Sequence, residues 1–201
     1  MLAVLLGLWA GVLHVCLGPD HVAALAPLAL GRGESALRAG LRWGLGHACA
    51  VALLAAGVFA LREALPLAAL SGWSERLVGL SLVALGCAGL WRLAASGVGR
   101  EAPAPSPHTA LCLGGLHGLA GSAHVLGALP ALALSTRAAT AGYLLAFCAG
   151  SLAAMLGVAW ALARLGARGS RRRWQALGAA ASLVVGALWI ASTFAAPRGI
   201  L

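Results

Sequence analysis

The chain has 201 residues, of which 61% are hydrophobic and only 9% charged. Soluble globular domains carry about 25% charged residues, so this composition excludes a soluble domain. The net charge of +9 comes from 14 basic residues, all of them Arg, against 5 acidic ones. Because the Arg residues fall mostly between apolar runs, we interpret them as contacts with lipid headgroups and expect no nucleic-acid partner.

Long apolar runs follow one another along the chain. Runs of about 20 residues are typical of helices that cross a hydrocarbon core about 30 Å thick. The runs that reach this length are 2–30, 43–61, 76–96, 110–135, 138–163 and 174–196. The sequence therefore predicts an all-α, polytopic membrane protein with six transmembrane helices, which form a single transmembrane domain over 1–201.

The first run contains Gly18-Pro19 near its middle. Proline lacks an amide donor and clashes with the preceding turn, although it is well suited to begin a helix. We therefore expect the first transmembrane helix to be broken at this point. The N-terminus has neither a basic region nor a clear cleavage site, so we expect this segment to be a retained span rather than a signal peptide.

Arg residues are distributed unequally between the two sides of the predicted bundle. One side carries Arg32, Arg38, Arg42, Arg92, Arg100, Arg164, Arg168, Arg171, Arg172 and Arg173, and the other carries Arg62, Arg76, Arg137 and Arg198. The positive-inside rule then predicts an N-out and C-out protein with a cytoplasmic, Pro-rich linker at 97–109. The all-Arg, Ala-rich composition suggests a GC-rich bacterial genome, and thus the bacterial inner membrane.

The two halves of the chain repeat. His14, His21 and Pro27 recur at one constant offset as His117, His124 and Pro130. Each half contains three predicted spans, an odd number, so the second half must be inverted in the membrane. Inverted repeats with broken helices are a transporter architecture. We therefore predict a 3+3 inverted repeat, with repeats at 1–96 and 110–201, and a transporter rather than an enzyme.

Few polar side chains interrupt the predicted spans. They are His14, Asp20, His21, His47, His117 and His124. An acid at the centre of a membrane helix costs about 2.5–3.5 kcal/mol, which points to a function. Imidazoles with a carboxylate suit Ni, Co, Zn or Cu, whereas Mg and Ca prefer all-oxygen sites. We predict that these six residues bind a divalent metal ion during its transport, and we expect no permanently bound cofactor. Alternatively, a lone His could form a hydrogen bond to the backbone of a neighbouring helix.

The stretch from His14 to His21 resembles the signature helix of the nickel/cobalt transporter family, in particular its six-span, urease-accessory-type branch. That motif is a His, four residues and then Asp-His; here five residues separate His14 from Asp20. The stretch 43–47 (WGLGH) resembles the family's Leu-Gly-His motif, and 115–121 (GLHGLAG) is similar to a glycine-rich helix that opens the second half. The resemblance implies a permease for Ni²⁺ or Co²⁺, with His14, Asp20, His21 and His47 at metal-selective positions.

Two other functions fit the same predicted architecture. A six-span thiol–disulfide electron conduit would use reactive cysteines in spans one and four, where Cys16 and Cys112 lie. However, Cys16 aligns with Leu119 in the repeat, and neither cysteine has an adjacent resolving cysteine. A transporter of another small solute could use the histidines to carry coupled protons.

Overall fold

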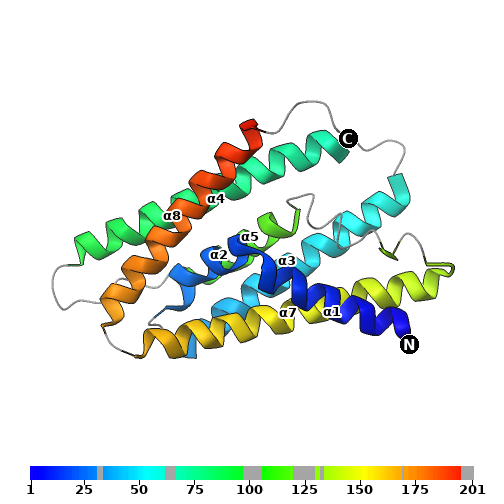
Figure 1. Cartoon of the computed structure of the whole chain (residues 1–201), viewed down its shortest axis with the longest axis horizontal. Helices are drawn as coiled ribbons and strands as arrows, with labels where there is room; N and C mark the ends of the chain where they lie inside the picture. Colours follow the sequence, from blue (N-terminus) through cyan, green and yellow to red (C-terminus); the bar gives the residue numbers. More distant parts are fainter. Residues whose placement is uncertain are drawn as a thin grey trace.

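The computed structural model describes residues 1–30, 34–61, 67–96, 106–119, 130–131, 134–168 and 170–195. This part of the chain is helical and contains no strand (Figure 1). Its helices are α1 (Leu2–Leu17), α2 (Pro19–Ala29), α3 (Glu34–Leu61), α4 (Leu67–Ala95), α5 (Pro107–Leu119), α7 (Arg137–Gly166) and α8 (Arg171–Ala195).

Several of these helices are long and apolar enough to cross a membrane. The four single candidate spans are Ser35–Gly57, Glu75–Ala95, Arg137–Gly166 and Arg171–Phe194, and α1 with α2 passes the same test as one bent span. The all-helical prediction is confirmed for the described residues, but six spans are not. The reason is that α5 has only 13 residues, too few to cross about 30 Å at 1.5 Å per residue, and residues 120–129 after it lie outside the described part.

The expected break in the first helix is present. α1 and α2 meet at an angle of 70°, with Gly18 in an extended conformation between them and Pro19 as the first residue of α2. Since proline has no amide hydrogen, it cannot continue the hydrogen bonds of α1, yet it costs nothing at a helix start. Gly18 leaves room for the two side chains that follow, because an added Cβ would overlap the imidazole of His21 and come close to the carboxylate of Asp20.

α2 lies at the centre of the structure. Eight of its 11 residues are buried, including Leu25 and Leu28 in the main core. Trp43 of α3, Leu82 of α4 and Met155 of α7 belong to the same core cluster. The start of α2, with Asp20 and His21, is therefore held in the interior from several sides.

The remaining helices pack in pairs. α1 lies along α7, α3 along α5, and α4 along α8 (Figure 1). Glycines allow the first two pairs to approach backbone to backbone: an added Cβ on Gly46 would overlap the carbonyl oxygen of Leu111, and one on Gly150 would overlap that of Leu8. Small residues that permit such close approach are typical of helix pairs in membranes.

The pair α4–α8 is also joined by hydrogen bonds. The hydroxyl of Ser182 donates to the carbonyl oxygen of Leu82 at 2.9 Å in the middle of the pair. At one end, the guanidinium of Arg172 donates to the carbonyl oxygen of Leu93 at 2.8 Å. These two bonds fix the register of α8 against α4.

The outer surface of the candidate spans is apolar. Leu53, Leu145 and Leu188 expose 71%, 72% and 65% of their surface, respectively. Large apolar side chains that face outward in the middle of long helices are unfavourable in water and favourable against lipid tails. These outward-facing leucines support the membrane assignment independently of the amino-acid composition.

Arg residues gather at one end of the molecule. The start of α3, the end of α4, the end of α7 and the start of α8 lie together there, opposite the N-terminus (Figure 1). These helix ends carry Arg38, Arg42, Arg92, Arg164, Arg168, Arg171, Arg172 and Arg173. The unequal division of Arg expected from the sequence thus corresponds, in the described part, to one basic end.

Candidate metal centre

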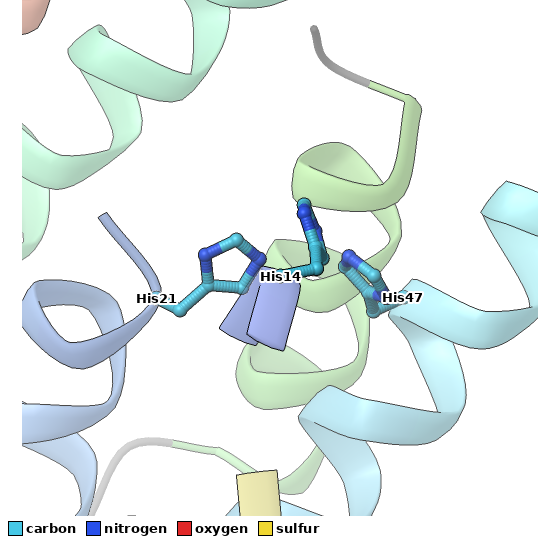
Figure 2. A group of neighbouring side chains, drawn as sticks. All are labelled: His14, His21 and His47. Atoms are coloured by element: carbon cyan, nitrogen blue, oxygen red, sulfur yellow. The ribbon is translucent and has the colours of Figure 1, made fainter. Parts of the chain in front are cut away.

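Three histidines from three helices come together in the interior (Figure 2). His14 belongs to α1, His21 to α2 and His47 to α3. One ring nitrogen of each lies within 4.8 Å of those of the other two. His21 and His47 are buried, and His14 is half-buried. We call these three side chains the histidine cluster.

The break at Gly18 brings His14 and His21 together. In a continuous helix, two residues seven positions apart are separated by about 10 Å along the axis. Because α2 turns away from α1 by 70°, the ring of His21 instead packs edge-on against that of His14, with 4.7 Å between centroids. The backbone amide of His21 donates to the carbonyl oxygen of Gly18 at 3.2 Å, which fixes the first turn of α2.

Asp20 lies behind His21 rather than within the histidine cluster. Its Oδ1 atom is 3.1 Å from Nδ1 of His21. A carboxylate can only accept, so Nδ1 carries the proton and the neutral ring has its lone pair on Nε2. A carboxylate that holds a metal-binding histidine in this way is a common outer partner of metal sites. The structure thus places Asp20 where it can orient His21 and supply negative charge.

His47 reaches the cluster from α3 and is supported by Trp43, one helical turn earlier. The two rings are stacked, with an interplanar angle of 16° and 5.6 Å between centroids. Trp43 is fully buried, and its indole also packs against His21, at 5.6 Å. The indole therefore forms an apolar wall on which two of the three imidazoles rest.

The other predicted residues lie at different distances from the cluster. His117 of α5 is buried, and its ring centroid is 6.3 Å from that of His21. His124 lies outside the described residues. His108, expected to be solvated, is exposed. His21 and His117 thus bring the first predicted span next to the described part of the fourth, while α1 itself packs along α7.

The cluster has the chemistry of a site for a borderline divalent ion. Zn–N bonds are about 2.0–2.1 Å long, so nitrogens that share one tetrahedral ion lie about 3.4 Å from one another. From their present spacing of up to 4.8 Å, the rings must therefore draw together by up to about 1.4 Å to share an ion. Imidazole ligands select Zn-like and Cu-like ions over Mg²⁺ and Ca²⁺, which prefer oxygen.

Cysteines do not form a comparable centre among the described residues. All five are free thiols. Cys16 and Cys112, the pair that an electron conduit would require, are both exposed on the helix surfaces.

Two plant proteins are similar to this chain. The chloroplast protein FOR GROWTH AND FERTILITY 1 of Arabidopsis thaliana is 35% identical over 177 residues, which covers 74% of this chain and 46% of the relative. The chloroplast protein FOR GROWTH AND FERTILITY 2 of the same plant is 33% identical over 169 residues, with 74% of this chain and 44% of the relative covered. The chain thus spans less than half the length of either relative. No protein-family model and no solved structure matches it.

These relatives correct three predictions. Membership of the nickel/cobalt transporter family is wrong, because the similarity that extends over most of the chain is to the chloroplast proteins. The specific assignment to nickel or cobalt falls with it. The bacterial inner membrane, with its N-out and C-out orientation, is likewise unsupported, since these relatives are named as chloroplast proteins. The resemblance rested on a short motif, from His14 to His21, which is too little to establish a family. The extra residue before Asp20 is part of the break between α1 and α2, where the carboxylate of Asp20 contacts His21.

Sequence reasoning missed two residues beside the cluster. Trp43 stands four positions before His47, a spacing that places both residues on one helix face. The place of Trp43 beside His47 could therefore have been inferred. Phe147 of α7 packs against His14 at 5.5 Å between centroids. No pattern in the sequence indicates that α7 lies along α1, so this contact could not have been predicted.

Proposed function

We propose that this chain is a membrane permease for a divalent transition-metal ion, which the histidine cluster binds on its way across. The observation that carries the proposal is the convergence of three imidazole nitrogens within 4.8 Å. Three histidines from separate elements meet at the break of a central helix, where a packing role would call for apolar side chains. A nearby carboxylate offsets part of the positive charge of an ion that has left water.

Asp20 supports a function in preference to a structural role. It is 7% exposed and follows a helix break in a span whose other polar side chains are the two imidazoles of His14 and His21. Burial of an acid in a membrane helix is costly, and such residues mark ion pathways or proton relays by default. Its hydrogen bond to His21 at 3.1 Å connects the acid directly to the histidine cluster.

The proposal includes a six-span, 3+3 inverted repeat. Two helix pairs support it: Gly46 contacts the Leu111 carbonyl in the pair α3–α5, and Gly150 contacts the Leu8 carbonyl in the pair α7–α1. Leu111 follows Leu8 in the sequence at the same distance as His117 follows His14. Gly150 follows Gly46 at a distance that is one residue longer. The same contact thus occurs twice, as a two-fold axis between the halves requires. The predicted fourth span, 110–135, begins within α5, and its residues 120–129, 132 and 133 lie outside the described residues.

The two halves are not equivalent at the site. In the repeat, Ser151 occupies the position that is equivalent to His47. Its hydroxyl donates to the carbonyl oxygen of Gly11 at 3.3 Å. Ala123 stands in the sequence where the first half has Asp20. We therefore propose one principal site, built by the first half near the midplane where inverted repeats meet.

Equilibrium metal binding tests the site. The purified full chain in detergent is titrated with Zn²⁺ or Cu²⁺, with Mg²⁺ as the oxygen-preferring comparison. His21→Ala and His47→Ala should each weaken Zn²⁺ binding by at least about tenfold, whereas His108→Ala, at an exposed position, should leave it unchanged. Equal Zn²⁺ affinity in all four proteins would reject the metal site. Uptake of another solute that depends on the same histidines would favour the proton-coupled alternative.

A further inference from the structure

His117 is a fourth imidazole beside the histidine cluster, and it belongs to the second half of the chain. Its side chain is 1% exposed, and its ring centroid lies 6.3 Å from that of His21. The backbone of α5 holds it there, because an added Cβ on Gly114 or Gly118 would overlap the carbonyl oxygen of Trp43 or His47, respectively. The close approach of α5 to α3 thus fixes the position of His117.

The hydrogen bond of His117 prepares one nitrogen for a ligand. Its Nδ1 lies 3.0 Å from the carbonyl oxygen of Leu113. A carbonyl oxygen can only accept, so Nδ1 carries the proton and the lone pair of the neutral ring is on Nε2. Within the described part of the chain, this Nε2 is buried and has no hydrogen-bond partner. Buried polar atoms are usually satisfied, whereas metal-binding histidines typically donate their other N–H to a carbonyl or carboxylate.

Trp43 connects the surroundings of His117 with those of the histidine cluster. Its indole centroid is 5.1 Å from the ring of His117, and it packs against His21 and His47 at 5.6 Å each. One aromatic wall therefore runs past the cluster to His117. The ring of His117 thus lies next to His21 and to the same indole that supports the histidine cluster.

We propose that Nε2 of His117 is a second binding station, which takes the metal ion from His21 during transport. The inference rests on the proposed function, and it adds the order in which the ion meets the two groups of ligands, first the histidine cluster and then His117. The ion exchanges one imidazole lone pair for another, so no bond within the protein is made or broken. The transfer carries the ion from the first half of the chain to the second.

Binding and flux are measured on the same variants, with Zn²⁺ as the ion and the purified full chain in liposomes. In His117→Asn, the amide nitrogen can still donate to Leu113, but the ligand at the position of Nε2 is lost. We expect the Kd for Zn²⁺ to stay within about threefold of the original value, while Zn²⁺ uptake falls by at least about tenfold. If His117→Asn does not insert, His117→Gln is measured in its place with the same expected result, because its amide reaches the position of Nε2 but is a poor ligand for Zn²⁺.

Two results would overturn the second station. Uptake at the original rate would show that His117 is a structural residue that only bonds its own helix. A Kd weakened as strongly as by His47→Ala would make His117 part of the first site. Failure of the proposed function itself is recognised separately, because His47→Ala would then change neither Kd nor uptake.

Discussion

Nδ1 of His21 lies 3.1 Å from Oδ1 of Asp20, its neighbour in the chain. The contact is possible because both residues open α2, directly after the break at Gly18. In the proposed metal site, the two adjacent residues would have different tasks: the imidazole of His21 would offer Nε2 to the ion, and the carboxylate of Asp20 would fix the ring and supply charge.

The first prediction concerns Asp20→Asn. The side-chain oxygen of Asn can still accept from His21, but the negative charge is lost, so Zn²⁺ affinity should fall by about 10- to 100-fold, the usual effect of changing an outer partner of a metal site. Removal of a buried acid should leave membrane insertion intact or ease it. Zn²⁺ titration of the purified variant measures the change, and an unaltered Kd would show that Asp20 plays no part in the site.

The second prediction concerns Gly18→Ala. The added methyl group would overlap the His21 ring, so His21 must turn away from His14 and the cluster must open. We expect a weaker Kd for Zn²⁺ with little loss of folded protein, because only side chains at the break have to move. Gly157→Ala is the matched control, since nothing lies within 4 Å of a Cβ at that position. Equal Zn²⁺ affinities of the two variants would contradict the geometry at the break.

The third prediction tests the close pairing of α1 and α7. A methyl group at Gly150 would overlap the carbonyl oxygen of Leu8, so Gly150→Ala must separate two backbones, at a cost of about 1–3 kcal/mol in the free energy of unfolding. Gly157→Ala, two turns further along α7, should be neutral or slightly stabilising. Thermal unfolding in detergent compares them, and equal midpoints would mean that the helices are not in backbone contact.

Much of the fold was accessible from the sequence. The break could be predicted because Pro19 cannot continue a helix, whatever surrounds it. Helix ends were less accessible. The second apolar run begins at residue 43, after Arg38 and Arg42, yet α3 begins at Glu34, since Arg is a good helix former and a helix can extend beyond its apolar part.

The site was accessible only in part. The rarity of imidazoles and of an acid in apolar spans identified His14, Asp20 and His21 as candidates. Their spacing along a straight helix could not show that a 70° bend would bring the two rings to 4.7 Å. The place of Asp20 behind His21 depends on that bend too, so the sequence alone could not distinguish a direct ligand from an outer partner.

Metal uptake distinguishes a permease from a protein that only binds metal ions. The purified chain is placed in liposomes that contain a fluorescent Zn²⁺ indicator, and the initial rate is compared for the original protein, His47→Ala and His108→Ala. We expect Zn²⁺ uptake that His108→Ala leaves unchanged and that His47→Ala reduces by at least about tenfold. An uptake rate no higher than that of empty liposomes, or one that His47→Ala leaves unchanged, would contradict it.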